Sequence, residues 1–257
     1  MIVGFVISGS GSKPIMVRAT GPSLTKYGVA GVLPDPTLEL YRDQTIIASN
    51  DSWNAAPNLG AIMAAGGDKL GGVVLSNKEA ILMQAFTPRD YTAQVKDAGN
   101  GQGIALVELF DTDTAQAGTA EFDAQPKLFN VSARAQVGTG ENVLIAGFVI
   151  NGNVPRHLLL RGVGPTLTNF GVTGVLLDPQ LKLFDNAGKI IAENDDWSTA
   201  PNPGAILAAN GTMLGTLTLD ARDAVLLVTL APAAYTVQIS GVNGTSGVAL
   251  IEIYDSP

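Results

Sequence analysis

The chain has two tryptophans, and they lie in loops of nearly the same sequence. One loop is "NDSWNAAPN", residues 50–58, and the other is "NDDWSTAPN", residues 194–202. Each joins an indole, whose flat face can stack on a sugar ring, to carboxylate and amide oxygens, which are the ligands that Ca²⁺ prefers. The chemistry open to these loops is therefore sugar binding through Trp53 and Trp197, or metal binding through the neighbouring oxygens.

The metal-binding interpretation rests on oxygen-bearing side chains in the two loops. They are Asn50, Asp51, Asn194, Asp195 and Asp196. The same residue types form Asx turns, in which the side chain bonds to the nearby backbone, and the spacing of an EF-hand loop is absent. Two interpretations stay open: turn-forming residues without a cofactor, or ligands of a structural calcium ion.

Two interpretations also apply to the indoles. Trp53 and Trp197 can be platforms for a glycan, or they can plug the end of a β-sandwich beneath a short helix, with the N–H satisfied by a nearby carbonyl. The plug is favoured, because one structural need would explain why both copies carry tryptophan at the same place.

Charged residues also stand in apolar surroundings. Arg18 and Arg161 are flanked by apolar residues, and Glu108 and Glu252 lie in the last apolar segment of each half. Because an isolated buried charge is costly, each arginine is expected to form an ion pair within its own half. The candidate partners are these two glutamates, or else Asp35 and Asp178. The functional alternative is a pair of glycosidase carboxylates.

Composition excludes several classes of protein. A net charge of −8, without a lysine or arginine cluster, argues against a nucleic-acid partner. Without cysteine there are no disulfides, thiolate metal sites or cysteine nucleophiles. The single histidine, His157, has Pro14 as its counterpart in the other half, which disfavours a Ser-His-Asp triad and excludes a three-histidine zinc centre within one chain.

No segment is predicted to insert into a membrane. The longest apolar runs, such as residues 224–235, are far shorter than the roughly 20 residues that span a bilayer. The first ten residues also lack the charged start and cleavage pattern of a signal peptide.

The chain is a tandem repeat. An offset of 143 aligns Arg18 with Arg161, and one extra residue in the turn "DNAG" raises the offset to 144, which aligns Trp53 with Trp197. Each copy has enough apolar residues for its own core, which predicts two domains. We assign residues 1–113 to the first domain, residues 114–126 to a linker of low hydrophobicity, and residues 127–257 to the second domain.

The first copy lacks a counterpart of one segment. Residues 128–143 precede the second repeat, and nothing comparable precedes the first. Either the chain is a fragment whose first strand was removed, which is the interpretation we favour, or residues 128–137 complete the sheet of the first domain. An unpaired edge strand would favour a homodimer.

The fold class is predicted to be all-β, with two tandem antiparallel β-sandwiches of jelly-roll type. Short runs rich in β-branched and aromatic residues alternate with turn residues. In the second copy we expect strands at 128–136, 143–150, 157–162, 180–184, 190–193, 224–230, 234–240 and 248–254. The segments "NLGAIMAAGGDKLG" and "NPGAILAANGTMLG" each predict one short helix at an end of the sandwich.

The second half of each copy resembles a known family. "LKLFDNAGKIIAENDDW" and "LLVTLAPAAYTVQISGVNGTSGVALIEIYD" resemble the bacterial pre-peptidase C-terminal (PPC-like) β-sandwich. The first copy departs from its D-x-x-G turn with "YRDQT" at residues 41–45. The resemblance implies an accessory module of large secreted bacterial proteins, located outside the cell or at its surface.

Three functions follow as hypotheses. The leading one is a non-catalytic extracellular module pair for adhesion, for binding a glycan or cell-surface polymer, or for spacing other domains. The second is a glycan hydrolase that uses Asp51, Asp195 and Asp196, or Glu108 and Glu252. The third is a structural unit that assembles by strand donation between chains.

Overall fold

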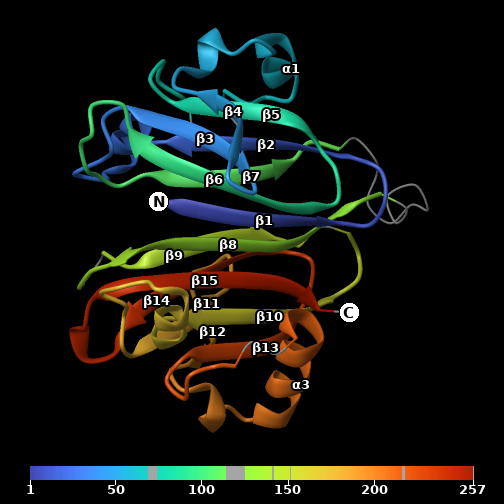
Figure 1. Ribbon diagram of the computed structural model, residues 1–257, viewed down its shortest axis with the longest axis vertical. Helices are drawn as coiled ribbons and strands as arrows, with labels where there is room; N and C mark the ends of the chain where they lie inside the picture. The colour runs from blue at the N-terminus through green and yellow to red at the C-terminus, as the bar shows by residue number, and fades with distance from the viewer. Residues whose placement is uncertain (69–73, 114–124, 141, 151, 216–217, 257) are drawn as a thin grey trace. The chain divides into compact units, whose positions relative to one another are not determined.

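The structure is a computed structural model that describes residues 1–68, 74–113, 125–140, 142–150, 152–215 and 218–256 (Figure 1). It divides into two compact units, Met1–Phe129 and Asn130–Pro257. Most of the predicted linker at 114–126 lies outside the described residues.

The second unit is built from eight strands that form two antiparallel sheets. The strands are β8 (Lys127–Val137), β9 (Leu144–Val149), β10 (Arg156–Val163), β11 (Pro179–Phe184), β12 (Ile190–Asn194), β13 (Ala224–Leu230), β14 (Ala234–Gly241) and β15 (Gly247–Ser256). Within the unit, one sheet has the order β13-β10-β15-β8 and the other β12-β11-β14-β9. Counted along the unit, these orders are 6-3-8-1 and 5-4-7-2, which is the strand order of a jelly roll.

Alternation of apolar side chains explains why the two sheets pack. On β10, Leu158 and Leu160 belong to the core between the sheets, together with residues of the opposite sheet such as Leu181 and Val237. Leu159 and Arg161 alternate with them and therefore point to the other face of their sheet. The predicted all-β jelly-roll fold is confirmed.

The first unit repeats this arrangement with seven strands among its described residues. They are β1 (Ile2–Ser8), β2 (Lys13–Thr20), β3 (Pro36–Arg42), β4 (Thr45–Asn50), β5 (Ala80–Phe86), β6 (Arg89–Asp97) and β7 (Leu106–Asp111). Within the unit the sheets have the orders β1-β6-β3-β4 and β5-β2-β7. The first sheet matches β9-β14-β11-β12, and the second matches β13-β10-β15. No described strand of this unit occupies the place that β8 holds in the other.

β8 is part of the second unit's sheet. It pairs with β15 in antiparallel register from Asn130 opposite Tyr254 to Val137 opposite Gly247. Residues 128–137 therefore complete the second sandwich through β15.

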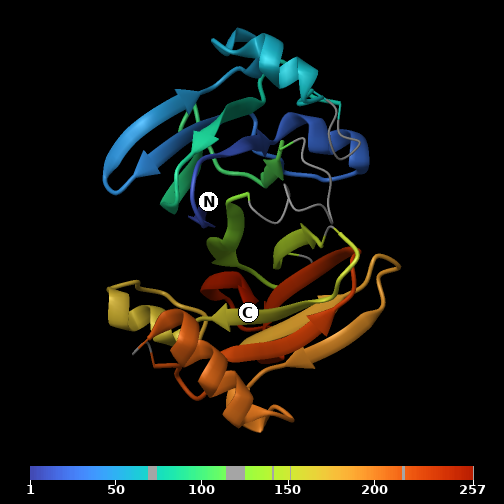
Figure 2. The same cartoon turned by 90° about the vertical axis from the view of Figure 1, so that its right-hand side faces the viewer.

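Short helices lie over the outer face of one sheet in each unit. In the first unit α1 (Leu59–Ala64) packs there, because Ile62 clusters with Met16 of β2 and Ile81 of β5. In the second unit α3 (Pro203–Leu214) contacts β10 and β13 (Figures 1 and 2). The helices were expected at an end of the sandwich. That expectation is wrong, because the helices pack on the outer face of a sheet. In the first unit the outward residues Met16 and Ile81 are apolar, and α1 shields them from water.

Candidate functional site

An ion pair crosses the outer face of the first unit's sheet. Arg18 on β2 lies directly opposite Glu108 on β7. Its Nε donates to Glu108 Oε2 at 2.8 Å, and its Nη1 donates to the carbonyl of Gly67 at 3.2 Å. The guanidinium also lies over the Phe110 ring at 5.0 Å. Burial raises the pKa of Glu108, and Arg18 acts against that rise.

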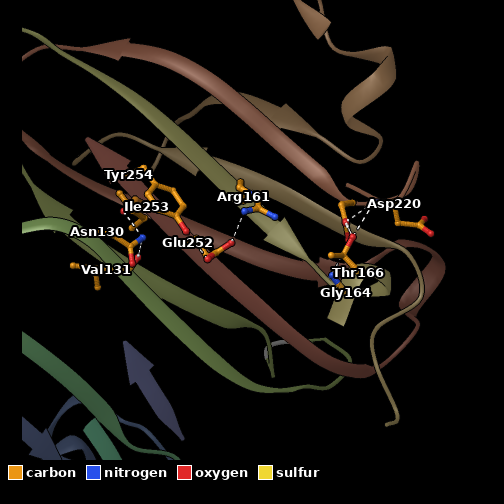
Figure 3. Close-up of polar contacts among 10 residues, drawn as sticks. Asn130, Val131, Arg161, Gly164, Thr166, Asp220, Glu252, Ile253 and Tyr254 are labelled. Atoms are coloured by element: carbon orange, nitrogen blue, oxygen red, sulfur yellow. Dashed lines mark hydrogen bonds and ion pairs between the residues drawn. The ribbon is translucent and has the colours of Figure 1, made fainter. Parts of the chain in front are cut away.

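The second unit contains the corresponding pair with a different third partner (Figure 3). Arg161 Nη1 lies 3.1 Å from Glu252 Oε2, and the Tyr254 hydroxyl donates to Glu252 Oε1 at 2.7 Å. Tyr254 replaces Phe110, so the aromatic ring is retained while a hydroxyl is added. Burial raises the pKa of Tyr254 well above its usual value, which keeps this donor protonated. Neither Asp35 nor Asp178 is the partner of these arginines.

A buried carboxylate holds a turn in each unit, and sequence reasoning missed both acids. Glu79 stands just before β5, and its oxygens accept the backbone N–H groups of Gly21 and Ser23 at 2.7 Å each. At the equivalent position, Asp223 accepts the Gly164 N–H at 3.0 Å and the Thr166 hydroxyl. Both carboxylates are fully buried.

The turn that these acids hold is a 3-10 helix that ends in a left-handed glycine. It comprises η1 (Pro22–Tyr27) followed by Gly28 with φ of 81°, and η4 (Pro165–Phe170) followed by Gly171 with φ of 74°. The glycine before each helix is needed for close packing, because a Cβ on Gly21 would lie 2.2 Å from the carbonyl oxygen of Leu33. We call residues 21–28 and 164–171 the aromatic turns.

Each aromatic turn exposes its ring. Tyr27 is 57% exposed and Phe170 is 63% exposed, and the 143-residue offset makes the two positions equivalent. The two residues before each ring are also exposed; they are Thr25 and Lys26, and Thr168 and Asn169. These residues were not singled out from the sequence, because exposure of an aromatic residue is decided by the surrounding packing. Their equivalence at one offset was the signal available.

The tryptophans are half-buried, and their polar atoms bond within the unit. The indole N–H of Trp53 donates to the Ser76 carbonyl at 2.8 Å, and that of Trp197 donates to the Asp220 carbonyl at 2.9 Å. The Trp197 backbone N–H donates to the carbonyl of Asp223. Trp53 packs beside α1 in the cluster on the outer face of the sheet.

The asparagines of the two loops join each loop to a strand. Asn50 Oδ1 accepts the Ile81 N–H and Asn194 Oδ1 accepts the Val225 N–H, both at 2.9 Å. Their amide groups donate to carbonyls two residues further along. Both asparagine side chains therefore use their oxygen and their amide group for hydrogen bonds within their own unit.

The acids of the loops lie near the surface. Asp51 and Asp195 are exposed and Asp196 is half-buried. Burial raises the pKa of Asp196, and Asp195 and Asp178 raise it further by repulsion. Within the part of the chain that the structure describes, no three His, Cys, Asp or Glu side chains are grouped to hold a metal ion. Calcium binding stays a prediction.

The helices of the described residues include none long and apolar enough to cross a membrane. His157, the single histidine, is paired through Nδ1 with the Thr229 hydroxyl at 2.8 Å.

Comparison with known proteins gives weak structural likenesses only. No protein-family profile and no curated protein sequence matches the chain. Tandem CBM51 modules of a family 98 glycoside hydrolase from Streptococcus pneumoniae are 9% identical, with 100% of this chain and 81% of that chain covered and a TM-score of 0.27. VP54 of PBCV-1 is 13% identical, with 99% and 88% covered and a TM-score of 0.24.

VP2 of infectious bursal disease virus is 10% identical, with 99% of this chain and 62% of that chain covered and a TM-score of 0.20. TM-scores of this size carry no argument about what this chain binds.

Proposed function

We propose that the chain is a non-catalytic pair of binding modules in which the aromatic turns contact a neutral glycan of a surface polymer. The observation that carries the proposal is the exposure of Tyr27 and Phe170 at equivalent positions. Single exposed apolar residues are common on protein surfaces, so exposure alone indicates no ligand. The recurrence of an exposed ring at the equivalent position of both units is what favours contact with a ligand.

The construction of the turns supports this role. A buried carboxylate, a Pro at the start of the helix and a left-handed glycine at its end hold each turn in one conformation. A rigid platform loses little conformational entropy when it binds. The exposed residues beside the rings include Asn169, whose amide can bond to sugar hydroxyls, and Thr25, whose hydroxyl donates to the Pro22 carbonyl and can still accept from a sugar.

Charge favours a neutral polymer. At a net charge of −8 the chain repels polyanions, and neither aromatic turn has more than one basic residue. An extracellular or cell-surface location is part of the proposal, and it rests on the resemblance to secreted bacterial modules.

The repeated buried or half-buried carboxylates are engaged in internal contacts, which favours a non-catalytic function. Glu108 and Glu252 are each paired with a buried arginine, and Glu79 and Asp223 each accept several hydrogen bonds. A glycosidase needs two carboxylates on opposite sides of one bond, which is a different arrangement.

Affinity electrophoresis in gels with neutral β-glucan, xylan or mannan tests the proposal. We expect at least one polymer to retard the chain. Tyr27→Ala with Phe170→Ala should abolish retardation while circular dichroism shows that the protein remains folded. The matched controls are Ile46→Ala and Val154→Ala, which remove apolar residues of similar exposure, 50% and 63%.

The same assay decides whether the glycan binds at the aromatic turns or at the tryptophans. Trp53→Phe with Trp197→Phe keeps an aromatic ring and removes the two indole donors, so it should lower stability while retardation remains in the folded protein. If retardation survives the loss of both turn rings but not of both indoles, the binding site is the tryptophan loops and our assignment is wrong.

A further inference from the structure

In the part of the first unit that the structure describes, the outer edge of β7 has no neighbouring strand, whereas its counterpart in the second unit has one. β7 pairs with β2 on one side, from Leu106 opposite Thr20 to Asp111 opposite Ile15. Its counterpart β15 pairs with β10 on one side and with β8 on the other. Among the described residues of the first unit, no strand takes the place of β8.

The second unit shows what register such a strand would take. Glu252 lies opposite Ser132, Ile253 opposite Val131, and Ile251 opposite Ala133. The 144-residue offset makes Glu108, Leu109 and Val107 the equivalents of these β15 residues. A strand with the β8 sequence would therefore place its serine beside Glu108 and its small apolar residues toward the core.

The side chains of β7 are less covered than those of β15. Ile251 is 1% exposed, Ile253 is 8% exposed and Tyr254 is 6% exposed. The equivalent residues Val107, Leu109 and Phe110 are all only half-buried. Among the described residues, β7 thus has no strand paired along its outer edge and presents apolar surface there, which is the combination that β-strand addition uses.

We propose that the outer edge of β7 accepts an extended peptide segment of β8-like sequence, supplied in trans by another polypeptide. The partner is defined by its chemistry: small apolar residues at alternate positions, corresponding to Val131, Ala133 and Ala135, with polar residues between them. The edge of β15 is already filled by β8, so the first unit provides the acceptor.

A labelled peptide with the sequence of residues 127–143 tests the proposal on the full chain. We expect saturable binding by fluorescence anisotropy and slower hydrogen exchange of the backbone amides of β7. The exchange of β15 should not change. The same peptide with proline in place of Ala133 is the matched control, because proline removes a ladder donor, and it should bind at least about tenfold more weakly.

A second variant fills the acceptor within the chain. Residues 127–143 are duplicated in front of Met1, which reproduces the connection of β8 to β9, since Met1 is equivalent to Leu144. This variant should bind no peptide, should melt at a higher temperature, and should show protected β7 amides without added peptide.

Several outcomes would overturn the proposal. One is the absence of binding at about 1 mM peptide, because a Kd weaker than this corresponds to only about 4 kcal/mol of binding free energy. Another is slower hydrogen exchange in the second unit alone, which would mean that the peptide displaces that unit's own β8. A third is a mass that rises with concentration and protection of β7 amides in the dimer, which would make a second copy of the chain the occupant. These results are independent of glycan retardation, so the two proposals fail separately.

Discussion

Thr166 and Asp223 lie 57 positions apart, yet the Thr166 hydroxyl donates to the buried carboxylate of Asp223. The same carboxylate accepts the N–H groups of Gly164 and Asp220, both at 3.0 Å. One side chain therefore joins the start of an aromatic turn to the loop that contains the carbonyl partner of Trp197.

Removing this carboxylate should destabilise the second unit. In Asp223→Asn the amide would direct its own hydrogens at groups that are already donors, so we expect a loss of about 1–3 kcal/mol in the free energy of unfolding. Urea denaturation followed by tryptophan fluorescence measures it. Asp220→Asn is the control, because the Asp220 side chain is 40% exposed. Equal losses in the two variants would contradict the assignment.

The pH dependence of stability should carry the signature of this buried acid. Burial raises the pKa of Asp223, and its hydrogen bonds act against that rise. Because the folded pKa lies above the unfolded value of 3.8, the folded state binds the proton more tightly, and this contribution to stability is lost as pH rises through the folded pKa.

The quantity to measure is the free energy of unfolding of the native chain minus that of Asp223→Asn, from pH 4 upward. It should decrease with rising pH above the unfolded pKa and level off above the folded pKa. The comparison within one pair of proteins cancels other groups, such as Glu39, whose pKa is lowered by Lys96 and Tyr41. A difference that increases with pH would contradict the raised pKa.

The two partners of the first unit's ion pair should respond differently to substitution. The Arg18 side chain is fully buried, while Glu108 is 19% exposed. Glu108→Ala leaves a buried cation without its carboxylate, and we expect a loss of about 3–5 kcal/mol. Arg18→Met fills the space with an apolar chain and leaves an acid that reaches water, so the loss should be smaller. Urea denaturation of both variants decides the order.

The effect of a chelator on the melting temperature tests whether the chain binds a structural calcium ion. Asn50 and Asn194 already use their oxygens for backbone N–H groups, and Asp51 and Asp195 are exposed. We therefore expect the melting temperature to be the same in EDTA and in millimolar CaCl₂. A rise of several degrees with calcium, absent in Asp195→Asn with Asp196→Asn, would establish a structural ion in the second loop.

The sequence determined the elements that local patterns encode. A nearly continuous apolar run predicts a strand at 224–230 and alternating apolar residues predict one at 234–240, and the structure has β13 and β14 at nearly these bounds. The cost of an isolated buried charge required partners for Arg18 and Arg161, and the 143- and 144-residue offsets made the two units equivalent. These inferences hold because periodicity, desolvation and duplication are properties of the chain itself.

Only the tertiary structure decided which distant groups meet. Glu79 and Asp223 are single acids in loops, with no local pattern around them. Each accepts hydrogen bonds from a turn more than 50 positions earlier, whose donors would otherwise be buried without acceptors. The position of α1 over a sheet face, the pairing of β8 with β15 and the exposure of Tyr27 and Phe170 also depend on how whole sheets pack. Burial is a property of a residue's neighbours in space, and sequence spacing alone does not contain it.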